Sequence, residues 1–205
     1  VVDNSGYVPR HVKDSVELLK DRCKRYVYIS TVAVYDFGIG VSNFPEDAKL
    51  ADLEDPAVEE VTGETYGPLN AACDHLVQEM LGDQATIVRP TYVVGPGDHT
   101  DRFTYWVDRV HRGGEVLAPS RPDSEAQWVD VRDLCPWVVT LAENDMPGIF
   151  NAAGPASSVS RSALMWGLRA MTDQPVTFYW PSDELLEEFE FNTPMMSPRE
   201  GSLKF

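Results

Sequence analysis

The stretch PRHVKDSVELLKDRCKRYVYISTVAVY, residues 9–35, joins a segment of helical periodicity to a run of β-branched and aromatic residues. Most apolar side chains in its first part fall on one helical face, which predicts a helix over about residues 9–22. The run RYVYIS, residues 25–30, then predicts a buried strand. A helix followed directly by such a strand is typical of the repeating units of a parallel α/β sheet.

The same alternation continues along most of the chain, after an acidic and proline-rich loop over about residues 36–65. Further strands are predicted over residues 85–90, 115–119, 148–154 and 176–180. Further helices are predicted over residues 66–81, 102–111, 131–143, 160–171 and 183–190. The tail from Asn192 has no periodicity and is predicted to be a loop. The whole pattern predicts an α/β fold with a doubly wound, Rossmann-like parallel sheet.

The composition and net charge of the chain argue against nucleic acids and membranes as binding partners. The chain has 205 residues, of which 43% are hydrophobic, enough to bury one substantial core. Its formal net charge of -16 would repel a phosphate backbone or an anionic membrane over most of the surface. No apolar run approaches the roughly 18 residues that a membrane helix requires, and the start VVDNSGYVPR lacks the features of a signal peptide. We therefore expect a cytoplasmic protein that binds neither nucleic acid nor membranes.

Cysteine and histidine are too scattered to predict a metal site. The cysteines are odd in number and far apart, which favours buried free thiols over disulfides or a CxxC metal site: Cys23, Cys73 and Cys135. No two histidines have metal-ligand spacing. His99 lies beside Asp98 and Asp101, where a solvated, carboxylate-rich turn is favoured over a cation site.

A glycine-rich phosphate loop is missing from the sequence. A doubly wound dinucleotide-binding fold normally opens with a strand, a G-x-G-x-x-G turn and a helix whose N-terminus holds the pyrophosphate. Gly38 and Gly40 give G-x-G, but position 43 is Asn, and the other glycines follow later elements. Val1 and Val2 have the pattern of a strand end. We therefore expect the chain to begin inside a sheet, truncated at its N-terminus relative to that fold.

Four segments, in this order, carry the strongest functional signal: YISTVAVY (28–35), ETYGPLNAACD (64–74), IVRPTYVVGPGD (87–98) and QWVDVRDLCPWVV (127–139). Thr31 follows the strand of the first segment, and Tyr66 lies in the second. The set resembles the extended branch of the short-chain dehydrogenases/reductases, the NAD-dependent epimerase/dehydratase group. The resemblance covers about residues 1–155. In that group a Ser or Thr and a Tyr-x-x-x-Lys pair face the nicotinamide.

The resemblance implies catalytic roles for Thr31, Tyr66 and Asn70. Thr31 would bond the substrate oxygen, Tyr66 would be the acid/base, and Asn70 would occupy the position of the lysine. Hydride transfer at a carbon that bears oxygen needs a matching proton transfer, so an acid/base must lie within hydrogen-bond reach. Residues i and i+4 share one helical face, which would place Asn70 beside Tyr66.

An asparagine at position 70 predicts slow chemistry. The phenol of tyrosine titrates near 10, so only about one molecule in a thousand is phenolate at pH 7 without a neighbouring positive charge. An amide can bond a ribose hydroxyl, but it carries no charge and cannot stabilise the phenolate as an ammonium group would. If the phenolate fraction limits turnover, the loss is roughly two to three orders of magnitude.

The resemblance also implies a wider set of ligand contacts. The cofactor would be NAD or NADP, bound by Asn4, Ser5, Tyr66, Asn70, Pro90, Thr91 and Val93. The substrate contacts would be Tyr92, Arg102, Gln127 and Arg132, because ligands of open α/β sheets gather beyond the carboxyl ends of strands. Surface ion pairs are an equal alternative for the two arginines, whose segments are rich in aspartate.

Two functions are therefore predicted. The first is an NAD(P)-dependent oxidoreductase or epimerase that acts on a hydroxyl or keto carbon of a sugar-like or small polar substrate. The alternative is a non-catalytic, truncated relative that binds a ligand or a protein partner. Residues 1–100 would form a partial dinucleotide-binding domain and residues 101–205 mainly a small substrate lobe, with residues 127–155 returning to the main sheet. A homodimer is a further expectation of the resemblance.

Overall fold

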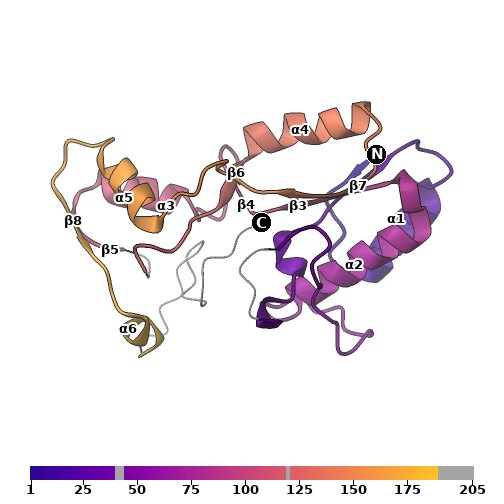
Figure 1. Cartoon of the computed structure of the whole chain (residues 1–205), viewed down its shortest axis with the longest axis horizontal. Coiled ribbons are helices and arrows are strands. Elements are labelled where there is room, and N and C mark those ends of the chain that lie inside the picture. Colours follow the sequence, from indigo (N-terminus) through magenta and orange to yellow (C-terminus); the bar gives the residue numbers. More distant parts are fainter. Residues whose placement is uncertain (40–43, 119–120, 189–205) are drawn as a thin grey trace. The chain divides into compact units, whose positions relative to one another are not determined.

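The computed structural model describes residues 1–39, 44–118 and 121–188, which form two units (Figure 1). Unit 1 contains residues 1–91 and 132–153, and unit 2 contains residues 92–131 and the described residues from 154 onward. Each unit has a hydrophobic core of its own. The tail predicted from residue 192 lies outside the described residues, as do the ends of the predicted strand 115–119 and helix 183–190. The predicted domain bounds stay a prediction.

Unit 1 is built on a four-stranded parallel sheet of order β1-β2-β3-β7. The strands are β1 (Val2–Asp3), β2 (Tyr26–Ile29), β3 (Ala85–Pro90) and β7 (Gly148–Ala152). In the register, Ile29 lies opposite Val88, and Pro90 lies opposite Ala152. All carboxyl ends therefore meet at one edge of the sheet. The predicted α/β fold with a parallel, Rossmann-like sheet is confirmed.

Helices cover both faces of this sheet (Figure 1). On one face lie α1 (Pro9–Leu19) and α2 (Tyr66–Leu81), and on the other lies α4 (Val131–Glu143). Proline suits the first position of a helix, because its fixed φ is helical and its missing N–H would have no partner there. The core under α1 and α2 includes Val12, Val16, Tyr26, Tyr28, Cys73, Val77, Leu81, Ala85 and Ile87.

Short 3-10 turns complete unit 1 at Val32–Val34, Phe37–Ile39 and Gly82–Gln84 (η1, η2 and η3). The first of them is separated from β2 by Ser30 and Thr31 and is followed by Tyr35. The cysteines are free thiols, but the expectation that they are buried holds only for Cys73, because Cys23 is half-buried and Cys135 is exposed. This residue lies on the solvent side of the amphipathic α4, whereas Cys73 faces the core from α2.

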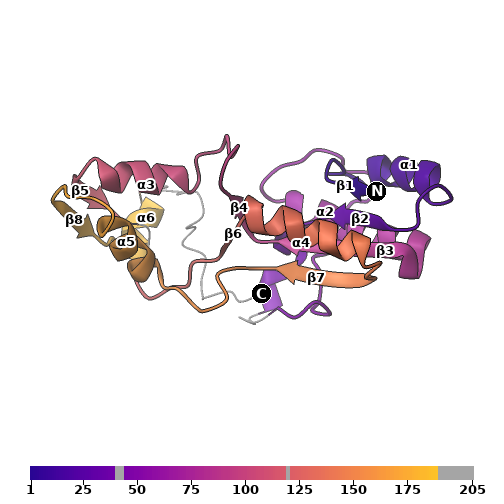
Figure 2. The ribbon, with the colours of Figure 1, turned by 90° about the horizontal axis from the view of Figure 1, so that it is seen from above.

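The described residues of unit 2 form two parallel strand pairs and three helices, which are labelled in Figure 2. Strand β4 (Tyr92–Val94) pairs with β6 (Trp128–Asp130), and β5 (Gly114–Leu117) pairs with β8 (Val176–Tyr179). The helices are α3 (Thr104–His111), α5 (Arg161–Arg169) and α6 (Asp183–Glu188). The core gathers Val94, Trp106, Val110, Val116, Ala126, Leu164 and Met165. Across the described ranges of both units, none of the helices has the length and apolar character needed to cross a bilayer.

Candidate active site at the carboxyl edge of the sheet

The structure brings the start of α2, with Tyr66, onto the turn that begins at Thr31. Thr31 precedes η1, and its Oγ1 accepts a hydrogen bond of 3.2 Å from the backbone N–H of Ala33. Gly67 packs on this turn so closely that an added Cβ would lie 2.3 Å from the carbonyl oxygen of Ala33. Only glycine permits this contact. Thr31 and Tyr66 are both half-buried and belong to segments that meet beyond the end of β2.

Asn70 lies one helical turn after Tyr66 and is buried, with 3% of its surface exposed. Its side-chain Nδ2 donates a hydrogen bond of 2.7 Å to the backbone carbonyl of Tyr66. The amide nitrogen is thus engaged with its own helix. A neutral amide in this position supplies hydrogen bonds and no positive charge.

Asp74 is the next residue on the same helical face, four positions beyond Asn70. Its Oδ2 accepts a hydrogen bond of 2.8 Å from Nε of Arg89 in β3, and the two side chains are only 1% and 2% exposed. Burial raises the pKa of the Asp74 carboxyl, and the attraction of the Arg89 guanidinium opposes this rise. The pair ties α2 to the middle of the sheet.

A buried polar network extends from this ion pair to the turn that carries Thr31. Nη1 of Arg89 donates to the hydroxyl of Tyr35 and to the carbonyl of Glu46, both at 2.9 Å. The Tyr35 hydroxyl in turn donates to Oδ1 of Asn151 in β7 at 2.7 Å. Burial raises the pKa of Tyr35, against the attraction of Arg89. We call Asp74, Arg89, Tyr35 and Asn151 the Arg89 network.

The loop after β1 contains two of the expected cofactor contacts, Asn4 and Ser5, and both are exposed. The backbone N–H and the hydroxyl of Ser5 donate to Oδ1 of Asp3 at 3.0 and 2.9 Å. Oδ2 of Asp3 accepts a hydrogen bond from the buried hydroxyl of Tyr26. Ser5 is therefore held against its own strand end, while the side chain of Asn4 faces solvent.

The ends of β3 and β7 place the next two expected contacts. Pro90 is the last residue of β3 and is buried, and so is Thr91 directly after it. The N–H of Thr91 donates to the carbonyl of Ala152 at 3.1 Å, which extends the β3–β7 pairing by one residue. Both residues thus lie at the same edge of the sheet as Thr31.

The remaining expected contacts are divided between the units. Tyr92, Val93, Arg102 and Gln127 belong to unit 2, and Arg132 belongs to α4 of unit 1. The guanidinium of Arg102 lies 5.3 Å from the ring centre of Tyr92, so these two side chains meet. Nε of Arg102 donates to the hydroxyl of Thr100 at 2.8 Å. It stays a prediction that Val93 contacts the cofactor and that the other four residues bind substrate.

The chemistry of the donors at this edge matches one end of a nicotinamide dinucleotide. Thr31 and Tyr66 offer uncharged hydroxyls, and Asn70 offers an amide. Uncharged donors suit the carboxamide and ribose hydroxyls of nicotinamide riboside, whereas a pyrophosphate requires cations or the N–H groups of a helix N-terminus. These residues therefore fit the nicotinamide end of NAD(P). In the described ranges, no three of the His, Cys, Asp and Glu side chains gather as metal ligands would.

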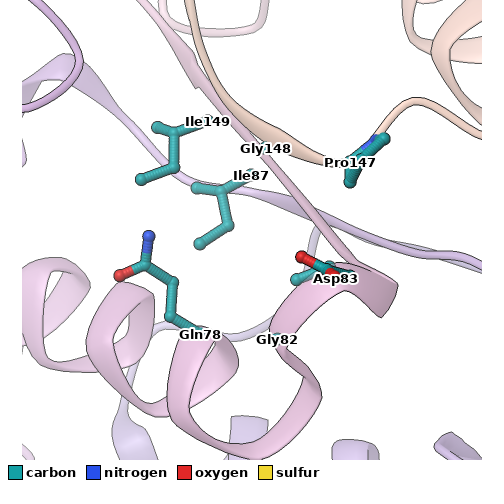
Figure 3. Close-up of a pocket in the computed structure, with 8 residues that line it drawn as sticks. Gln78, Gly82, Asp83, Ile87, Pro147, Gly148 and Ile149 are labelled. Atoms are coloured by element: carbon teal, nitrogen blue, oxygen red, sulfur yellow. The ribbon is translucent and has the colours of Figure 1, made fainter.

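A cavity of about 340 Å³ lies at the opposite edge of unit 1 (Figure 3). Its lining residues come from the end of α2, from η3, from the first half of β3 and from the start of β7 with the residue before it: Gln78, Gly82, Asp83, Ala85, Ile87, Pro147, Gly148 and Ile149. Ligands of open α/β sheets bind at the carboxyl ends of strands. We therefore place the candidate site at the edge that carries Thr31 and not in this cavity.

Sequence reasoning missed a second tyrosine beside Tyr66. The ring centres of Tyr7 and Tyr66 are 6.5 Å apart, and the rings are tilted by 41°. Tyr7 lies four residues after the end of β1, so an aromatic residue in the loop that follows a strand was the available signal. The Arg89 network was missed as well. Its available signal was the four-residue spacing of Tyr66, Asn70 and Asp74 along one helix.

A sequence model of the NAD dependent epimerase/dehydratase family matches residues 11–153. The chain belongs to this family. The resemblance found in the sequence is thereby confirmed at the level of the family. The N-terminal truncation and the equivalence of Asn70 to the lysine of other epimerase/dehydratase family members stay predictions.

Solved structures of similar fold include several enzymes named for nucleotide sugars. The dTDP-4-dehydrorhamnose reductase of Bacillus anthracis, solved with NADP, is 20% identical with a TM-score of 0.62, over 88% of this chain and 57% of that one. The UDP-glucuronic acid 4-epimerase of Bacillus cereus, solved with NAD, is 16% identical with a TM-score of 0.60, over 93% and 61%. The dTDP-glucose 4,6-dehydratase of Bacillus anthracis, solved with NAD, is 15% identical with a TM-score of 0.61, over 91% and 64%.

At these identities the likeness shows the fold of the epimerase/dehydratase family alone. The chain spans less than two thirds of the length of each of these three structures. None of the curated proteins matches the chain significantly.

Proposed function

We propose that the chain carries the nicotinamide- and substrate-facing side of an NAD(P)-dependent oxidoreductase or epimerase. The reacting group is a hydroxyl or keto carbon of a sugar. The observation that carries this proposal is the contact between Gly67 and Ala33, which seats the start of the Tyr66 helix on the turn of Thr31. Thr31 and Tyr66, which carry the two hydroxyl groups, lie in two of the sequence segments on which the family resemblance is based.

Each residue at this edge has a separate task in the proposed reaction. The bound nicotinamide supplies or accepts the hydride. Tyr66 exchanges a proton with the substrate oxygen, as an acid/base within hydrogen-bond reach must. Oγ1 of Thr31 accepts from the Ala33 N–H, so its hydroxyl hydrogen can be donated to the same substrate oxygen. Asn70 would hold a ribose hydroxyl of the cofactor through its amide, and Pro90 and Thr91 would line the place of the nicotinamide ring.

The Arg89 network holds the turn that carries Thr31 in place relative to the sheet and α2. It joins the residue that ends the η1 turn, Tyr35, to β3, β7 and α2 through hydrogen bonds of 2.7 to 2.9 Å. A turn held at one end by buried bonds keeps Thr31 in one position. Catalysis benefits because reacting groups must be held within a fraction of an ångström of their working geometry.

The proposed substrate is a nucleotide sugar, because the structural relatives described above are enzymes named for dTDP and UDP sugars. Tyr92, Arg102, Gln127 and Arg132 are the proposed substrate contacts. The family commonly carries an arginine shortly before the segment that corresponds to WVDVRD, and this chain has SEAQ (124–127) there. Recognition of the nucleotide phosphates therefore rests on other cations in this protein.

The second candidate is a relative that binds the same ligands without turning them over. The observation in its favour is the hydrogen bond from Asn70 to the Tyr66 carbonyl, because a neutral residue engaged with its own helix leaves Tyr66 without an activating charge. The two candidates share a binding site and differ in proton transfer. Turnover therefore separates them.

The test has two steps, binding and turnover. NADH fluorescence is titrated with the protein, and a saturable change is expected; no change at millimolar concentration contradicts both candidates. Turnover is then measured with a panel of nucleotide sugars that includes UDP-glucose. Net reduction of NAD reports an oxidoreductase, and chromatography of the sugar products reports an epimerase, which regenerates its NAD in each cycle. Tyr66→Phe should lower turnover by about 10²- to 10⁴-fold with unchanged NADH affinity. Equal rates for Tyr66→Phe and the unsubstituted protein would favour the non-catalytic relative.

A further inference from the structure

Tyr7 is an exposed aromatic residue in contact with Tyr66. It lies in the loop after β1, its side chain is 51% exposed, and its ring centre is 6.5 Å from that of Tyr66. The neighbours on either side, Gly6 and Val8, are both buried. Because both neighbours are buried, the backbone of Tyr7 is held in place. Its side chain is exposed to solvent beside Tyr66, the proposed acid/base.

Two contacts and the burial of Val8 hold the loop that presents Tyr7. The hydroxyl of Tyr28 donates to the carbonyl of Gly6 at 2.7 Å. A Cβ at Gly6 would lie 2.3 Å from a methyl group of Val12, so the loop backbone packs directly on α1. Val8, with 3% of its surface exposed, is the residue that precedes the first turn of α1. The loop therefore offers the Tyr7 ring in one place, and little ordering remains to be done when a ligand arrives.

We propose that Tyr7 contacts the substrate, and that the group packed against its ring is the reacting sugar. This inference rests on the proposed function. Binding sites for small molecules combine aromatic walls with a few polar groups that fix orientation, and Tyr7 and Tyr66 supply one of each. The sugar is chosen over the nucleobase because Tyr66 acts on a sugar carbon, so the ring next to Tyr66 is the ring that reacts. The base of a nucleotide sugar lies two phosphates and a ribose away.

The experiment compares UDP-glucose with UDP, each titrated by calorimetry into the protein in saturating NADH. Tyr7→Ala should weaken UDP-glucose by about three- to tenfold, the effect of one aromatic contact, and leave UDP unchanged. Tyr7→Phe keeps the ring and should bind both probes like the unsubstituted protein. Leu18→Ala is the matched control, because Leu18 is a similarly exposed residue of α1, at 59%. It should change neither affinity.

The outcomes separate this inference from the function on which it rests. If UDP-glucose binds the unsubstituted protein and Tyr7→Ala binds it equally well, Tyr7 is no substrate contact and the proposed function survives. Equal weakening of UDP and UDP-glucose would place the ring against the nucleotide, which also overturns the inference. If the unsubstituted protein binds NADH but neither UDP-glucose nor UDP, the proposed substrate class is wrong, and the proposed role of Tyr7 is then wrong as well.

Discussion

Replacing Arg89 by leucine tests the claim that the Arg89 network frames the site. The substitution leaves the Asp74 carboxylate in a place where only 1% of its side chain is exposed, without its partner at 2.8 Å. It also removes the hydrogen bonds that Arg89 donates to Tyr35 and to the Glu46 carbonyl. Breaking a buried ion pair on one side costs about 3–5 kcal/mol. This is a large part of the 5–15 kcal/mol that stabilises an ordinary domain.

The loss should depend on pH, with a sign set by Asp74. Burial raises the pKa of this carboxyl, and Arg89 opposes the rise, so Arg89→Leu should raise the pKa of Asp74 further. A carboxyl with a raised pKa in the folded protein binds more protons there than in the unfolded chain. Stability is then lost as pH rises from the unfolded pKa, near 4, through the folded one. The deficit of Arg89→Leu should therefore be larger at pH 8 than at pH 5.

Hydrogen exchange of β2 and β3 peptides in urea measures this free energy, because it reports on unit 1 separately from unit 2. Arg10→Leu is the control, since Arg10 forms a two-bond pair with Glu59 in which the side chains are 58% and 44% exposed. Exposed pairs contribute about 0–1 kcal/mol. Arg89→Leu with a loss no larger than that of Arg10→Leu, or with the same loss at both pH values, would refute the reasoning.

Three further predictions concern single positions. Asn70→Lys should supply the missing positive charge, and should therefore raise turnover by about 10- to 100-fold and lower the pH optimum. Asn70→Ala is the control and should neither raise turnover nor shift the optimum. A pH profile that is the same for Asn70→Lys and the unsubstituted protein would contradict the role of this position. Gly67→Ala should destabilise unit 1 by about 1–3 kcal/mol and reduce turnover, as overpacking does, while Gly63→Ala, with open space around it, should melt normally. Iodoacetamide should label the exposed Cys135 in the native protein and Cys73 only after unfolding, because burial raises the pKa of Cys73 to about 12; native labelling of both at equal rates would be inconsistent with the structure.

The sequence predicted the elements whose periodicity is long enough to detect. The runs around β2, β3 and β7 are rich in β-branched and aromatic residues, and the helices before and after them are amphipathic. Strands β4 and β6 were missed because each has three residues, too few for a period. Strands β4 and β6 form by pairing with each other. Such pairing between segments that are distant in the chain gives no local sequence pattern by which a strand could be predicted.

The candidate site was predicted only where a motif had fixed spacing. Thr31, Tyr66 and Asn70 follow from ordered segments and from the four-residue repeat of a helix. Arg89 was not predicted as a site residue, because the role of an arginine in a buried strand can be inferred only when its partner, Asp74, is known. Tyr7 was passed over for the same reason, since its contact with Tyr66 joins positions far apart in the chain.

The place of β7 in the chain affects how unit 1 can be assembled during translation. This strand, with Asn151, follows residues 92–131 of unit 2 in the sequence, yet it pairs with Thr86–Pro90 of β3, a strand whose six residues are all buried. A ribosome adding about 5–20 residues per second needs several seconds to proceed from β3 to β7. During that interval β3 lacks its second neighbour, β7, and presents an unpaired strand edge of the kind to which other chains add. Slow decoding between the two strands should therefore lower the soluble yield of the protein.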